Sequence, residues 1–255
     1  MSAEGSWREL PGDPGLVRTT LATDGAPWVG TPGGRPVPRF ARDAALDRVL
    51  CSLQARFGPQ RWWPAETPFE VIVGAVLTQH TSWRNVRLAL ESLRALVPLT
   101  PATLASMEPD ALARAIRPSG SYRVKARRLQ SVSRWYLRVG GLAALARAPL
   151  ESLRAGLLTV HGVGPETADA ILCHAAGRAT PVIDAYARRV LERHGLIPAG
   201  LPYERIRSEL ILGLEPSQVV FEEFHALCVR VGYDHCKPQP RCLTCPAPTP
   251  TLTVD

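Results

Sequence analysis

The sequence predicts an all-α fold, and three features lead to that prediction. From Asp43 onward, apolar residues recur mainly at the spacing of amphipathic helices. Period-two alternation, which marks a half-buried strand, is scarce, and no hairpin turn joins two β-branched runs. The segment Thr67-Pro68-Phe69-Glu70 combines a capping threonine, a proline in the first turn and a glutamate at the third helical position, as helix starts do.

The expected elements begin after an extension. Residues 1–40 are rich in proline and glycine, so regular structure is not expected there, although Trp7 and Trp28 are expected to dock on the body. A buried central helix is expected to follow Thr67, and Gly74 allows close packing against it. Helices are expected at 43–57, 68–77, from about 82, near 101 and 109, and over 122–136, 150–158, 165–176 and 185–194.

The chain is basic. Its 30 Lys and Arg residues against 23 Asp and Glu give a formal net charge of +7, and the isoelectric point is near 9.4. This balance suits an anionic partner such as nucleic acid, or simply a basic soluble protein. No run approaches the roughly 18 apolar residues of a membrane span, and Glu4, Arg8 and Glu9 stand where a signal peptide would be apolar. We expect a cytoplasmic monomer with no membrane partner.

A basic face is expected on the helix that starts at Tyr122. Its outer side carries Arg123, Lys125, Arg127 and Arg128. The charge pattern alone fits either a solvated surface or a contact with DNA.

A tight turn, Val160-His161-Gly162-Val163-Gly164, separates two expected helices. Glycines two residues apart permit unusual backbone conformations, and Pro165 suits the first position of the second helix. Such a turn can present backbone amides to a DNA phosphate. It can equally be an ordinary connection between two helices.

Four segments together resemble the endonuclease III family of helix-hairpin-helix DNA glycosylases. They are V-H-G-V-G-P-E-T-A-D, the V-I-D-A-Y that follows it, T-P-F-E-V-I-V-G-A-V-L-T-Q-H-T-S and G-S-Y-R-V-K-A. W-W-P-x-E-T-P-F-E and T-Q-x-T-S-W resemble the branch with 3-methyladenine glycosylases. The resemblance covers about 66–245 and implies two lobes. One, 65–181, is a six-helix domain with the helix-hairpin-helix motif at about 150–177; the other, 41–64 plus 182–255, bears a cluster, and double-stranded DNA binds between them.

Asp184 is the catalytic carboxylate that the resemblance implies. Taken alone it is a helix N-cap, and the two roles are compatible because a helix N-terminus favours the charged carboxylate. Such a carboxylate can stabilise the positive charge that builds on the sugar as an N-glycosidic bond breaks.

Glu166 stands where bifunctional members of the family carry their Schiff-base lysine. A carboxylate cannot form an imine, so we expect a monofunctional enzyme that uses water, without AP lyase activity. Glu166 either orients that water or is a solvated residue of the first helical turn.

The resemblance also implies residues that contact DNA and the extruded base. Gln79 matches the family's glutamine that fills the gap in the duplex, whereas Ser121 is smaller than the family's apolar second wedge. The expected DNA contacts are Gln79, Lys125, His161, Gly162, Val163, Gly164 and Thr167, and the candidate base-stacking residues are Trp83, Tyr122 and Tyr186.

Four cysteines predict a metal site: Cys228, Cys236, Cys242 and Cys245. Their spacing alone leaves zinc and iron both open. The resemblance favours a 4Fe-4S cluster, but the family's spacing is C-x6-C-x2-C-x5-C. Cys236, Cys242 and Cys245 match its first three positions, and Cys228 is the best replacement for the missing fourth.

The sequence therefore predicts a monofunctional base excision repair glycosylase that removes a damaged base, with an alkylated purine as one candidate. Two rival interpretations are a DNA-binding, damage-sensing or redox-active iron–sulfur protein of the same fold without turnover, and a zinc-stabilised helical DNA-binding protein.

Overall fold

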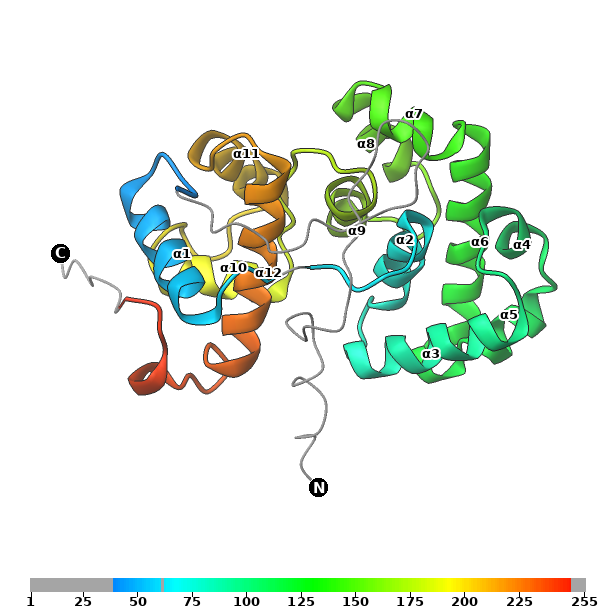
Figure 1. The fold of residues 1–255 in the computed structure, drawn as a ribbon, viewed down its shortest axis with the longest axis horizontal. Helices are drawn as coiled ribbons and strands as arrows, with labels where there is room; N and C mark the ends of the chain where they lie inside the picture. Colours follow the sequence, from blue (N-terminus) through cyan, green and yellow to red (C-terminus); the bar gives the residue numbers. More distant parts are fainter. Residues whose placement is uncertain (1–38, 61, 249–255) are drawn as a thin grey trace. The chain divides into compact units, whose positions relative to one another are not determined.

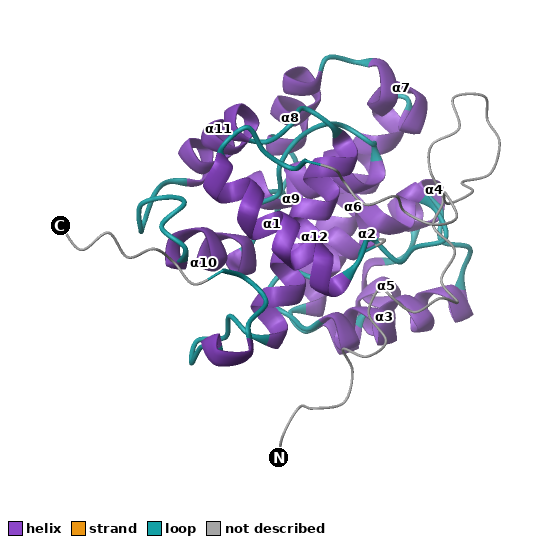
Figure 2. Ribbon diagram, turned by 60° about the vertical axis from the view of Figure 1, so that its left-hand side comes forward, coloured by secondary structure: helices purple, strands orange, loops and turns teal. Residues whose placement is uncertain are grey.

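The computed structural model describes residues 39–60 and 62–248. These residues fold as helices joined by loops, with no strand among them (Figure 2), and the all-α prediction is confirmed. One isolated antiparallel bridge, between Ala41 and Leu214, is the extended pairing found in this part of the chain. The predicted docking of Trp7 and Trp28 lies outside the described residues. None of the helices seen here is long and apolar enough to cross a membrane.

The described residues divide into two compact units. One comprises residues 63–178, and the other joins 39–60 and 62 with 179–248. The first contains α2 (Pro68–Leu77), α3 (Trp83–Leu96), α4 (Pro101–Ser106), α5 (Pro109–Ala115), the 3-10 turn η2 (Arg117–Ser119), α6 (Tyr122–Arg138), α7 (Gly141–Arg147), α8 (Leu150–Leu158), α9 (Pro165–Ala170) and the π-helical turn η3 (Ile171–Ala175). The second contains α1 (Ala44–Phe57), α10 (Ala185–Arg193), α11 (Tyr203–Gly213), α12 (Gln218–Asp234) and the 3-10 turn η4 (Cys242–Thr244).

Helix α2 is the buried centre of the first unit, where it packs against α3, α6, α9 and η3 (Figure 1). Thr67 caps it as predicted, since its side chain accepts a hydrogen bond from the amide of Glu70. The Glu70 carboxylate accepts from the amide of Glu66 and pairs with Arg94. Gly74 allows the indole of Trp63 to lie against the helix, because a Cβ there would be 3.0 Å from its Nε1 atom.

The helical hairpin of the first unit consists of α8, a turn at 159–164, and α9 with η3. A buried ion pair joins its two arms, with Arg154 Nε and Nη2 donating to the two carboxylate oxygens of Asp169 at 2.9 and 3.1 Å. The helix expected over 165–176 is present, and its second half widens into the π-helical turn η3. There the amide of Ala176 donates to the carbonyl of Ile171, five residues back.

Helix α12 is the centre of the second unit, and both α10 and α1 pack against it (Figure 1). It is apolar over most of its length, with Phe221, Phe224 and Leu227 fully or almost fully buried. Gly232 lets α10 approach closely, since a Cβ there would be 2.6 Å from Cδ1 of Tyr186. This packing sets the position of the first turn of α10, where Asp184 is the cap.

Candidate functional site

The two glycines of the hairpin turn play different parts. Gly162 has φ +83°, and a Cβ on it would lie 2.3 Å from Cγ of Arg128, so both its conformation and its surroundings require glycine. Gly164 is extended, with φ −94°, and nothing lies within 4 Å of the position its Cβ would take. The expectation that both glycines supply special backbone conformations is therefore correct only for Gly162. Gly164 instead leaves a backbone surface uncovered.

The other hairpin residues are divided between surface and interior. His161 and Glu166 are exposed, whereas the side chains of Val163 and Thr167 are buried. For Val163, therefore, the backbone but not the side chain is a candidate for contact with a ligand. The side chain is buried and anchors the turn to the core.

Gln79 lies at the end of α2 and is tied to this turn. Its Nε2 atom donates to the carbonyl of Gly162 at 3.0 Å and to Oγ1 of Thr167 at 2.9 Å. Its Oε1 atom accepts a hydrogen bond from Nη1 of Arg128 at 2.5 Å. The structure thus brings together three predicted site residues, and it adds Arg128, which the sequence pattern left on the basic face.

Lys125 does not lie on the outer face of α6, and that expectation is corrected. Its side chain is buried, and Nζ donates to the carbonyls of Leu77 at 2.9 Å and Ser119 at 2.6 Å. Burial lowers the pKa of Lys125 to about 8, with a further contribution from the nearby charge of Arg128. The ammonium therefore holds two loops together and cannot reach a DNA phosphate from this position.

The helical period contains a signal for this burial. Residues 122, 125, 129, 132 and 136 form one stripe at alternating three- and four-residue spacing, and position 125 falls on it. A lysine on a buried apolar stripe needs acceptors such as backbone carbonyls for the hydrogen bonds of its ammonium.

The candidate stacking residues of the first unit are half-buried. Trp83 packs edge-on against Trp63, with ring centroids 5.4 Å apart, and Trp63 also contacts the ring of His174 at 5.5 Å. Tyr122 follows Gly120 and Ser121, both of which have positive φ, and the Arg123 guanidinium lies 5.8 Å from its ring centre. Trp63 was missed as a site candidate, although the W-W-P motif pointed to it.

Asp184 is the N-cap of α10 in the second unit. Its Oδ1 atom accepts a hydrogen bond from the amide of Ala187 at 2.7 Å, as the capping pattern predicts. Its Oδ2 atom lies 3.7 Å from Nε2 of His225, a buried residue of α12 whose ring also meets Trp62 edge-on. His225 is the neighbour of the carboxylate that the sequence pattern did not single out for that role.

Tyr186, expected to be a base-stacking residue, packs against two neighbours in the second unit. One side of its ring contacts Gly232, and the Arg189 guanidinium lies 5.2 Å from its centre. Burial, followed by the charge of Asp184, raises the pKa of its hydroxyl. The ring faces covered by these contacts are not available to a base.

The four cysteines differ in exposure, and Cys236 lies close enough to both Cys228 and Cys245 for their charges to interact. Cys228 is buried in α12, and burial raises the pKa of its thiol well above its usual value, with Asp184 and Cys236 adding to the effect. Burial also raises the pKa of Cys245, and Cys236 and Cys242 contribute. The donor type and the proximity of these thiols fit a metal or iron–sulfur group. In the part of the chain described, however, no three His, Cys, Asp or Glu side chains are arranged to hold a metal ion.

Two arginines of α10 support the cysteine loop. Arg189 Nε donates to the carbonyl of Cys236 at 2.5 Å. Arg193 donates to the carbonyls of Lys237 and Pro238, at 2.5 and 2.9 Å, and to Sγ of Cys236 at 3.5 Å. Sequence reasoning missed this support, because arginines on a helix face carry no sign of a loop far ahead in the chain.

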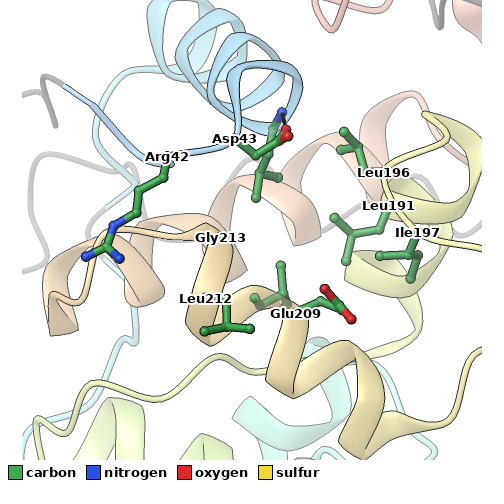
Figure 3. Close-up of a pocket in the computed structure, with 10 residues that line it drawn as sticks. Arg42, Asp43, Leu191, Leu196, Ile197, Glu209, Leu212 and Gly213 are labelled. Atoms are coloured by element: carbon green, nitrogen blue, oxygen red, sulfur yellow. Dashed lines mark hydrogen bonds between the residues drawn. The ribbon is translucent and has the colours of Figure 1, made fainter.

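The second unit also contains a cavity of about 440 Å³ (Figure 3). It is lined by Arg42, Asp43, Leu46, Leu191, Leu196, Ile197, Glu209, Leu210, Leu212 and Gly213. None of the predicted site residues lines it, so we do not assign it to the functional site.

The family of the chain follows from comparison with known proteins. Residues 73–216 match the model of the HhH-GPD superfamily of base excision DNA repair proteins. The chain belongs to this family. It is 38% identical over 193 residues to a Methanocaldococcus jannaschii protein named as a candidate DNA repair glycosylase, a match that covers 74% of this chain and 88% of that protein. It is 32% identical to endonuclease III of Thermotoga maritima over 179 residues, or 70% and 79% of the two chains.

Solved structures agree on the fold. The H. pylori 3-methyladenine DNA glycosylase bound to 1,N6-ethenoadenine has a TM-score of 0.65 and 28% identity, over 74% of this chain and 97% of that one. A trapped endonuclease III–DNA intermediate has a TM-score of 0.66 and 23% identity, over 78% and 90%. The predicted membership of the endonuclease III-like helix-hairpin-helix superfamily is confirmed, and the protein is a base excision repair DNA glycosylase by family.

The lowered pKa of Lys125 predicts a pH effect on stability. The folded pKa of about 8 lies below the ordinary value of 10.5, so the unfolded chain binds more protons between these values and the fold gains stability as pH rises through them. Between pH 7.5 and 10, urea unfolding should show the wild type gaining stability relative to Lys125→Gln. Lys125→Arg is the control. Like glutamine, arginine does not titrate in this pH range, so the difference in unfolding free energy between the wild type and this variant should show the same trend with pH. A difference that stays constant with pH would contradict the assignment.

Proposed function

We propose that the protein is a monofunctional glycosylase that hydrolyses the N-glycosidic bond of a damaged base in double-stranded DNA. The absence of AP lyase activity is inferred from where the lysines of the chain lie. The chain has two lysines, Lys125 and Lys237. The first is buried with its ammonium bonded to two carbonyls, and the second lies in the cysteine loop with its Nζ 5.3 Å from the ring centre of Tyr233. Neither stands at the hairpin position 166, where Glu166 is exposed.

Asp184 is the proposed central carboxylate. Its Oδ1 atom accepts the cap hydrogen bond, which fixes the side chain, while Oδ2 faces Nε2 of His225 at 3.7 Å. A carboxylate fixed in this way can stabilise the oxocarbenium-like sugar or orient a water molecule without reorganising during the reaction. Glu166, exposed on the hairpin, is a second candidate for orienting water.

The proposed substrate class is an alkylated purine. The half-buried rings of Trp83 and Tyr122 offer π faces that attract a cationic base more than a neutral one. The structural relative with 28% identity, which is bound to 1,N6-ethenoadenine, also supports an enlarged or alkylated purine. Tyr186 is a weaker candidate, because Gly232 and Arg189 already contact its ring.

We assign DNA backbone binding to the hairpin turn, where His161 is exposed and the backbone around Gly164 is not covered by side chains. Phosphate contacts of this kind position a protein without reading sequence, and the net charge of +7 favours them. We assign this turn to a lobe of residues 65–181 and Asp184 to a lobe of residues 41–64 plus 182–255. We expect the enzyme to act as a cytoplasmic monomer.

We propose that Cys228, Cys236, Cys242 and Cys245 hold a 4Fe-4S cluster, whose thiolate ligation would stabilise the loop that follows α12. The four thiol donors, and the nearness of Cys236 to Cys228 and Cys245, support this proposal. Arg193, which donates to Sγ of Cys236, would then contact a ligand of the cluster. Zinc is the alternative occupant.

The first prediction concerns base release. Asp184→Asn keeps a side-chain oxygen that can cap α10 but removes the charge, so it should lower excision at least a hundredfold with little change in duplex affinity. The measurement is release of free base from a panel of lesion duplexes, with anisotropy for binding. Undiminished release by the variant would refute the assignment, and borohydride should trap no covalent complex with the wild type. Binding by the wild type without release from any lesion would favour the non-enzymatic interpretation.

The second prediction concerns affinity for duplex DNA. Gly164→Leu should weaken binding to damaged and undamaged duplex alike, because a side chain would cover the backbone surface near the phosphate. Its φ of −94° accepts any residue, so the variant should fold normally, which circular dichroism checks. Val139→Leu, a half-buried change outside the hairpin, is the control. Wild-type affinity in the folded Gly164 variant would mean that the turn only connects two helices.

The third prediction concerns the metal. Cys228→Ala and Cys242→Ala should lose metal equally, because each leaves three thiolates, whereas Cys51→Ala, outside the set, should retain it. Metal analysis and absorbance near 400 nm distinguish iron from zinc. A full iron complement in the Cys228 variant would show that Cys228 is not a ligand of the cluster.

A further inference from the structure

The carboxamide of Gln79 is fully engaged before any DNA is bound. Both hydrogens of its Nε2 atom have acceptors, Gly162 O and Thr167 Oγ1, and its oxygen accepts from Arg128. A side chain that enters a gap in the duplex must first leave these partners. Gln79, which the resemblance to endonuclease III implies enters the duplex, is thus held against the hairpin by three hydrogen bonds.

Arg128 is the charged member of this group, and it lacks an anion. Its guanidinium donates Nη1 to the neutral oxygen of Gln79, its Nε atom is buried without a hydrogen-bond partner, and among the described residues it pairs with no carboxylate. The like charge of Lys125 lies close enough to interact with it. A partly buried guanidinium is much better satisfied by a phosphate or carboxylate than by an amide oxygen.

The position of Arg128 is set by packing. Its side chain lies across Gly162, where a Cβ would clash with its Cγ, Cδ and Nε atoms at 2.3 to 2.5 Å. The guanidinium is therefore held beside the hairpin turn rather than projecting freely from α6. An anion that binds at this turn would therefore lie on the same side of the hairpin as the guanidinium.

We propose that Arg128 is a latch that exchanges Gln79 for a DNA phosphate. In the free protein it holds Gln79 against the hairpin, and on binding it moves to the sugar–phosphate backbone and releases the carboxamide. Engagement of the DNA backbone is thereby coupled to release of the side chain that probes the base stack. This inference rests on the proposed function insofar as the ligand is duplex DNA.

The first test measures binding to undamaged duplex by anisotropy across a range of KCl concentrations. Arg128→Met keeps the aliphatic stem over Gly162 and removes the charge, so the slope of log affinity against log salt should fall by about 0.9, the value for one phosphate. Arg138→Met is the matched control. It removes the same charge from an exposed residue of the same helix, about 15 Å along it, and should leave the slope unchanged. An unchanged slope for Arg128→Met, or an equal fall in both variants, overturns the proposal.

The second test is a double-mutant cycle with Gln79→Ala. Removing the carboxamide frees Arg128 in advance, so this variant should bind undamaged duplex about fivefold more tightly than the wild type with the same salt slope. The gain should vanish when Arg128→Met is also present. Unchanged or weaker binding by Gln79→Ala would show that the contact is a static brace and overturn the latch. Circular dichroism melts must show that all variants are folded.

Failure of the inference is distinguishable from failure of the proposed function. If the wild type releases a damaged base and binds duplex but Arg128→Met leaves the salt slope unchanged, only the proposed role of Arg128 is contradicted. A wild type that neither binds duplex nor releases a base contradicts the proposed function itself.

Discussion

The buried ammonium of Lys125 connects the parts of the first unit on which its candidate site depends. It binds the carbonyl of Leu77, at the end of α2, and that of Ser119, before the turn into α6. Each hydrogen bond to a charged group contributes about 1.5–3 kcal/mol, while leaving such a charge buried and unpartnered costs several. The two loops are therefore held in place together, and neither can move without exposing the ammonium or orphaning a carbonyl.

Local backbone strain occurs beside both anchored carbonyls. His80 has φ 54° and Ser121 has φ 44°, and within the described residues these are the non-glycine residues with positive φ. Such conformations persist only where the surroundings enforce them. His80 directly follows Gln79, and Ser121 opens the turn into α6, so the enforced conformations lie at the positions that sequence resemblance links to probing of the duplex.

In the second unit, α10 combines two tasks. Its N-terminus holds Asp184, with the carboxylate fixed by the amide of Ala187. One and two turns further, Arg189 and Arg193 hold the carbonyls of the cysteine loop. The helix is kept in register by the contact between Tyr186 and Gly232, which makes the placement of the carboxylate sensitive to the packing of α12.

The sequence by itself determined the features that local chemistry decides. Helix starts at Thr67 and Asp184 were predictable because a side-chain oxygen caps amides two or three residues ahead, and the all-α class followed from the period of apolar residues. The family was also readable from contiguous motifs. Only the tertiary structure decided that Lys125 is buried, that Gly162 and not Gly164 requires glycine, and that Arg128 holds Gln79. These depend on carbonyls and side chains brought together from residues 34 to 83 positions apart, and no local pattern encodes which of them meet.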